Sequence, residues 1–174
     1  MNYNIFGPFA IPQRGGQKSY MIYNEDIENF WDSVQACNLD LRDACGCYVF
    51  AIRTGGGIKP WYVGKAQKQN FYSEVFTDHK MSMFKEIVHN MHGTPVLFLL
   101  GRLTETGKFS KPSVKHKDID FLETWLIADA IRKNKDLYNK KKTKFIKEIQ
   151  VDSYLNNNKK KNLSEHAFHQ MFNK

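Results

Sequence analysis

A single glutamate in an otherwise apolar helical pattern is the first residue whose position indicates chemistry. Glu123 lies within the segment 118–133, with Ile119 and Ile127 one helical turn before and after it. A carboxylate on an apolar helix face is costly unless it is paired with a cation or bound to a metal. Two interpretations stay open at this point: an ion pair with a lysine or arginine, and a ligand of a metal ion.

Two tyrosines form the second chemical feature. Tyr48 closes the triplet Gly-Cys-Tyr at 46–48, and Tyr62 opens the triplet Tyr-Val-Gly at 62–64. The surrounding segments are rich in β-branched and aromatic residues and predict two antiparallel strands joined at the glycine-rich break 54–57. Neighbouring strands can bring two hydroxyls together on one face of a sheet. Each tyrosine taken alone is more simply interpreted as an ordinary strand residue.

The elements that must position these residues have a helix–strand–strand–helix–strand–helix order. The patterns predict a helix from 24 or 25 to about 37, strands at 46–53 and 61–66, a short turn at 71–76, a helix from 77 or 78 to about 91, a strand at 95–103 and a helix at 118–133. Prolines and paired glycines predict irregular structure over 1–20. The fold class is therefore α/β (α+β), with a small three-stranded antiparallel sheet flanked by helices. Its 95–103 strand is apolar on both faces, which favours a central position.

The order and spacing of these features resemble the GIY-YIG nuclease superfamily. In that family a Gly-Ile-Tyr and a Tyr-Ile-Gly triplet lie on neighbouring strands, and a later helix carries one metal-binding glutamate, usually followed by an asparagine. This chain contains, in the same order, Gly46-Cys47-Tyr48, Tyr62-Val63-Gly64, Glu123 and Asn139. The resemblance implies one domain over 1–174, with a GIY-YIG-like core at 45–142, an N-terminal extension at 1–44 with one helix, and a basic C-terminal extension at 143–174.

The resemblance also implies an activity, that of a divalent-metal-dependent endonuclease that hydrolyses DNA phosphodiester bonds. Glu123 would bind Mg²⁺ or Mn²⁺ with waters completing the coordination shell, and the metal would stabilise charge developing on the phosphate. Tyr48 would activate or position the attacking water, Tyr62 would complete the site, and Asn139 would be the family's asparagine. As a general base a phenol needs its pKa lowered from about 10 by cations, and Lys65 is placed to help. We expect the two tyrosines and Glu123 to point into one cleft.

One position departs from the family pattern. The family carries an arginine on the helix after the second triplet, where it holds the scissile phosphate, and the approximate position here is Glu74. A carboxylate cannot replace a bidentate phosphate donor. Either His79 and Lys80 form a variant phosphate clamp, or catalysis is impaired and the chain is a GIY-YIG-like nucleic-acid-binding module. A structural or interaction domain with an incidental basic tail is the third alternative.

The distribution of charge indicates a polyanionic partner. The chain carries a net charge of +8, and residues 131–174, with twelve Lys or Arg and four Asp or Glu, carry a net charge of +8 by themselves. Such an asymmetry is typical of DNA-binding surfaces, and we expect backbone phosphates to be contacted by Lys140, Lys141, Lys142 and Lys144. The alternative is a solvated basic tail. Strict DNA sequence specificity would require the terminal extensions or a homodimer.

Composition argues against several other classes. No apolar run has the roughly 18–20 residues needed to span a bilayer, and the first residues lack the basic and apolar regions of a secretory signal. The cysteines, Cys37, Cys45 and Cys47, are odd in number and favour reduced thiols over a disulfide framework. A cytoplasmic protein without a membrane partner is therefore expected.

Overall fold

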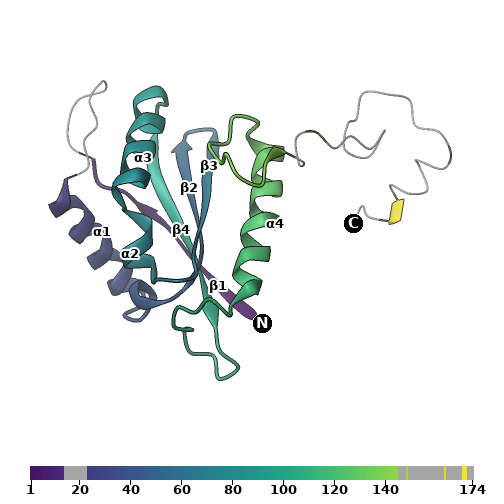
Figure 1. Cartoon of the computed structure of the whole chain (residues 1–174). Helices are drawn as coiled ribbons and strands as arrows, with labels where there is room; N and C mark the ends of the chain where they lie inside the picture. Colours follow the sequence, from purple (N-terminus) through teal and green to yellow (C-terminus); the bar gives the residue numbers. More distant parts are fainter. Residues whose placement is uncertain (14–22, 145–147, 149–162, 164–169, 172–174) are drawn as a thin grey trace. The chain divides into compact units, whose positions relative to one another are not determined.

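The computed structural model describes residues 1–13 and 23–144 and, beyond them, positions 148, 163, 170 and 171. The chain divides into two compact units, Met1–Asn139 and Lys140–Lys174. The first unit contains, in chain order, β1 (Asn2–Ala10), α1 (Asn24–Cys37), a 3-10 turn (Leu41–Asp43), β2 (Gly46–Thr54), β3 (Gly57–Ala66), α2 (Phe71–Val75), α3 (Asp78–Asn90), β4 (Thr94–Leu103) and α4 (Lys117–Lys133) (Figure 1).

The sheet has four antiparallel strands in the order β1-β4-β2-β3, so the prediction of three strands is wrong. The additional strand is β1, which lies within the segment 1–20 that was expected to be irregular. Gly7 and Pro8 interrupt its strand pattern in the sequence. In the structure they lie at a bulge between Phe6 and Phe9, and β1 is an edge strand. A proline is tolerated there because the ladder is already interrupted.

The other predicted elements agree with the structure to within a residue or two, except at the start of β3. That strand begins at Gly57 rather than at residue 61. Pro60 interrupts the sequence pattern, but it lies on the other edge strand, opposite Ala51 and next to a bulge in the β2–β3 pair. As predicted, β4 is central, with β1 on one side and β2 on the other.

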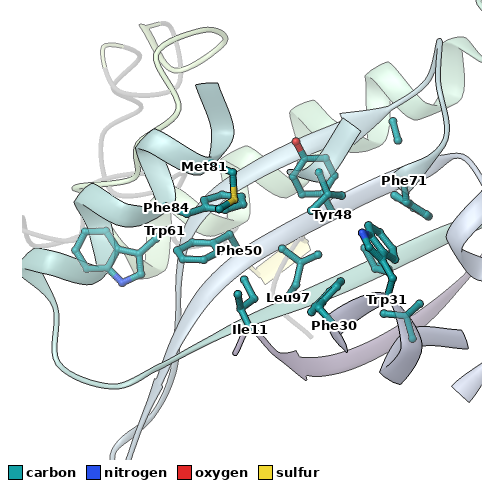
Figure 2. Packing of buried hydrophobic residues seen from close by; sticks show 14 of the residues in the cluster. Ile11, Phe30, Trp31, Tyr48, Phe50, Trp61, Phe71, Met81, Phe84 and Leu97 are labelled. Atoms are coloured by element: carbon teal, nitrogen blue, oxygen red, sulfur yellow. The ribbon is translucent and has the colours of Figure 1, made fainter. Parts of the chain in front are cut away.

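Helices cover both faces of the sheet. In Figure 1, α1, α2 and α3 lie on one side of the strands and α4 on the other. The larger apolar cluster, shown in Figure 2, joins the α1–α3 side to the sheet, and the ring of Phe50 stacks on that of Phe84 with centroids 4.2 Å apart. A smaller cluster contains Cys47, Leu100 and Ile119 on the α4 side. Within the described residues, no helix has both the length and the apolar character needed to cross a membrane.

The glycines of the two tyrosine triplets are sterically required. A Cβ atom at Gly46 would lie 1.9 Å from the carbonyl oxygen of Leu100 on β4. At Gly64 it would lie 2.3 Å from Cζ and 2.4 Å from the hydroxyl oxygen of Tyr48. Strand pairing places Gly64 directly opposite Tyr48. The phenol of Tyr48 therefore extends over Gly64 toward the outer edge of the sheet.

Part of that outer edge is closed by the segment that follows α4. Asn134 donates from Nδ2 to the carbonyl of Pro60 at 2.8 Å, and the amide of Tyr138 donates to the carbonyl of Trp61 at 2.9 Å. Asn139 accepts from the amide of Val63 at 2.9 Å and donates to its carbonyl at 2.7 Å. These bonds satisfy main-chain groups that an edge strand leaves unpaired, so this segment fixes β3 just before Gly64.

The contact between Gly64 and Tyr48 gives a stability prediction. Gly64→Ala should destabilise the fold by about 1–3 kcal/mol, the usual range for forcing extra volume into a packed site. Gly55→Ala is the matched control, because a Cβ atom there meets nothing within 4 Å. Urea unfolding followed by circular dichroism measures both variants. Equal unfolding midpoints for the two variants would show that the phenol of Tyr48 moves aside at no cost.

Candidate functional site

Two tyrosines on the α3 side of the sheet form the centre of the candidate site. The ring centroids of Tyr48 and Tyr62 are 6.2 Å apart. Tyr48 is fully buried, and its hydroxyl makes no hydrogen bond of acceptable geometry with the described residues. Figure 2 shows this hydroxyl at the end of the ring that points away from Leu97 and Phe30. A buried hydroxyl without a partner is uncommon in folded proteins and marks a position where a bound group can complete the hydrogen bonding.

Lys80 on α3 lies over both tyrosines. Its Nζ atom is 5.6 Å from the ring centroid of Tyr48 and 5.8 Å from that of Tyr62. The same Nζ donates to Oε1 of Glu74 on α2 at 2.5 Å. The other oxygen of Glu74, Oε2, accepts a hydrogen bond from Nε2 of Gln69 at 2.6 Å. The ammonium is thus held by one carboxylate and two aromatic faces.

A second group of charges reaches the same edge from the α4 side. Lys65 pairs with Cys47 across the strands, so both point toward α4, where Cys47 packs against Ile119. The ammonium of Lys65 forms an ion pair with Asp120 and lies 3.6 Å from Oε2 of Glu123. The side chain of Glu123 is 13% exposed. Glu123 is therefore mostly buried, lies near a cation and keeps a small part of its surface exposed.

The electrostatics of Tyr62 connect the two sides of the sheet. Burial, and after it the nearby carboxylates of Glu123 and Glu74, together raise the pKa of Tyr62 to about 12. The pKa of Tyr48 is raised well above its usual value, first by burial and then by its neighbours Tyr62 and Glu74. A pKa lowered by cations was expected from the sequence, and the structure gives the opposite direction, because burial and negative charge dominate. Both phenols are neutral at physiological pH.

The structure brings together most, but not all, of the site residues predicted from the sequence. Those that gather at the edge of β3 are Tyr48, Tyr62, Lys65, Lys80 and Glu123. His79 is exposed on α3, and its side chain makes no hydrogen bond or ion pair within the described part of the chain. Asn139 binds the main chain of Val63. The four lysines Lys140, Lys141, Lys142 and Lys144 are exposed and belong to the second unit.

Two residues at the site carried no separate prediction. Asp120 lies three positions before Glu123 on α4, and the spacing of three places both carboxylates on one helix face. That spacing is visible in the sequence and could have indicated a paired site. Gln69 lies in the turn before α2, and no pattern in the sequence connects it with Glu74.

If this site holds a metal ion, Glu123 is the carboxylate that would bind it. The described residues contain no group of three or more His, Cys, Asp or Glu side chains placed to hold a metal ion. Mg²⁺ commonly keeps several waters and takes one or two carboxylates, so one carboxylate with part of its surface exposed would be sufficient for it. A thiolate metal site at Cys45 is not supported, because burial raises the pKa of this thiol to about 11 and its Sγ donates to the carbonyl of Ser110.

Comparison with known proteins gives no relative. The chain matches no protein-family model, no curated protein and no solved structure. What the site does must therefore be inferred from its own geometry and charges.

The raised pKa of Tyr62 predicts a loss of stability in alkali. Below pH 10 both folded and unfolded chains keep the proton, so this residue adds no pH dependence. Between the ordinary pKa of 10.0 and the folded value of about 12, only the unfolded chain ionises, and the free energy of unfolding falls as pH rises. Urea titrations at pH 9, 10 and 11 should show a smaller fall for Tyr62→Phe than for the parent. Tyr72→Phe, at a more exposed tyrosine, is the control. Parallel curves for the parent and Tyr62→Phe would contradict the assignment.

Proposed function

We propose that this chain is a divalent-metal-dependent DNA endonuclease of the GIY-YIG type. The observation that carries the proposal is that Glu123 on α4 lies near enough to Tyr48 and Tyr62, on adjacent strands, for its carboxylate to raise the pKa of both phenols. The strand order also supports it, because the two triplets lie on paired strands β2 and β3 and the glutamate follows on a later helix. The contact of Tyr48 with Gly64 gives a steric reason for a glycine in the second triplet.

In this proposal the residues divide the work of phosphodiester hydrolysis. A water oxygen forms a bond to phosphorus as the bond to the leaving oxygen breaks. The attacking water gives one proton to bulk solvent, and the leaving oxygen takes one from bulk solvent. Glu123 would hold a divalent ion, which would supply positive charge for the phosphate and the leaving oxygen. Lys65 holds Glu123 and Asp120 in place. Tyr48 and Tyr62, being neutral, position the water and phosphate by hydrogen bonds instead of removing a proton.

A second candidate function is DNA binding without cleavage. Glu74 stands near the position where the family has its phosphate-binding arginine, and the raised tyrosine pKa values remove a simple general base. Both observations favour a catalytically impaired module that keeps the scaffold. Metal-dependent cleavage separates the two candidates directly.

The first test is plasmid nicking by the full chain with Mg²⁺, Mn²⁺ or EDTA. We expect nicking with either metal and none with EDTA. Glu123→Gln keeps the size of the side chain and removes the charged ligand, so nicking should fall by about 10²-fold or more while DNA affinity stays nearly constant. Glu105→Gln, in the exposed loop before α4, is the matched control. If the parent nicks no DNA under any metal condition, the binding module is the better description. Unfolding of Glu123→Gln would instead assign Glu123 a structural role.

The second test concerns the lysines of the second unit. Their exposure fits contacts to backbone phosphates, and each contact releases counterions. Replacing Lys140, Lys141 and Lys142 together by glutamine should reduce the slope of log affinity against log salt by about 2–3, at roughly 0.9 for each lost phosphate contact. The control replaces three exposed lysines of the loop before α4, Lys108, Lys111 and Lys115. Fluorescence anisotropy with a labelled duplex at several salt concentrations measures both. An unchanged slope would mean that these lysines only solvate the surface.

A further inference from the structure

We propose that Lys80 is the phosphate-binding cation of this site and that Glu74 is a built-in competitor, which occupies Lys80 until a phosphate oxygen displaces it. This inference rests on the proposed function and specifies how that site takes its anionic substrate. Glu74, which stands near the position of the family's arginine, thereby has a role of its own in phosphate binding.

The burial of Lys80 distinguishes it from a surface lysine. Its side chain is 12% exposed, and its ammonium lies over two phenol rings and against one carboxylate. Removing an ammonium from water is costly unless it is paired and held. An ordinary solvated lysine on α3, such as Lys85, avoids that cost by staying exposed. The position of Lys80 is therefore a specific feature of the site.

The groups around Lys80 form a set of donors that suits an oxyanion. The hydroxyl of Tyr48 is buried and has no hydrogen-bond partner of acceptable geometry among the described residues, and Lys80 lies over the ring that carries it. Tyr62 supplies a second hydroxyl next to the first. Because both phenols keep their protons, each can donate a hydrogen bond to a phosphate oxygen. The cation adds a charge-assisted bond at the same place.

Glu74 is arranged to release Lys80 without becoming an unpaired carboxylate. Its side chain is 22% exposed, more than that of Lys80, so it is the more solvent-accessible member of the pair. Its second oxygen is held by Gln69 at 2.6 Å. When an incoming phosphate takes the ammonium, Gln69 and solvent still satisfy the carboxylate. One anion then replaces another on Lys80, and the buried ammonium is never left without a counter-charge.

The competition has a measurable consequence, because the wild-type site must bind phosphate less tightly than a site without Glu74. Glu74→Gln keeps the shape of the side chain and leaves a neutral oxygen that can accept from Lys80. Removal of the like charge should tighten phosphate binding roughly tenfold, since like-charge juxtaposition weakens association. Lys80→Met should weaken it by about 10²-fold, the usual scale for loss of one preorganised donor, and Lys80→Arg should restore most of it.

The experiment is a titration of the full chain with inorganic phosphate, without metal, followed by nitrogen–proton correlation spectra. The variants are Glu74→Gln, Lys80→Met, Lys80→Arg and the double variant Glu74→Gln/Lys80→Met. In the double variant no charge of the pair remains, so it stays interpretable if Lys80→Met alone fails to fold. The controls are Glu105→Gln and Lys85→Met, which make the same charge changes at exposed positions.

Tighter binding in Glu74→Gln together with equally weak binding in both Lys80→Met variants supports the inference. It is overturned if Glu74→Gln binds phosphate no better than wild type, or if Lys80→Met binds as well as its control. The phosphate titration contains no cleavage step. It therefore tests the competition between Glu74 and phosphate independently of the proposed nuclease activity. If the protein nicks DNA but Glu74→Gln does not change phosphate binding, only the role of Glu74 as a competitor is rejected. If the protein nicks no DNA but the variants change phosphate binding as predicted, only the proposed nuclease activity is rejected.

Discussion

The close contact between Tyr48 and Gly64 is the constraint on which the candidate site depends. The phenol lies where any side chain at Gly64 would be, so Tyr48 crosses the edge strand and places its hydroxyl at the border of the sheet. A larger residue at this position would force the ring back toward the core. The hydroxyl would then be separated from Lys80 and from the charges that arrive beside α4.

At the β3 edge of the sheet, the two helical layers act on the same group. Within a sheet, residues on opposite faces are separated by the strands themselves. At the edge of β3 that separation ends, and the phenol of Tyr62 responds both to Glu74 on the α2 side and to Glu123 on the α4 side. Asn139 fixes β3 at Val63, immediately before Gly64, so the edge is held at the point where the groups meet.

Helices and strands with one periodic apolar face could be predicted from the amino-acid sequence. Residues whose type is unusual for their position could also be identified from it. Glu123 could be found because a carboxylate on an apolar helix face is conspicuous. Strand β1 could not, because its edge position and bulge tolerate a Gly-Pro pair that is otherwise a signal for irregular structure. The ion-pair partners of the charged residues could not be predicted from the sequence either. Lys65 and Asp120 are 55 positions apart, and only the packing of α4 on the sheet brings them together.

The balance of charge at the site connects the proposed metal to the proposed competitor. Among the residues named here, two ammonium groups, Lys65 and Lys80, face three carboxylates, Glu74, Asp120 and Glu123. Such a set has a net negative charge and repels a phosphodiester. One divalent ion at Glu123 would make the net charge of this set positive. A phosphate would then be attracted to the site and could replace Glu74 as the partner of Lys80. In the proposed function, the carboxylate that stands near the arginine position thus weakens phosphate binding in the absence of metal, which a permanently free arginine would not do.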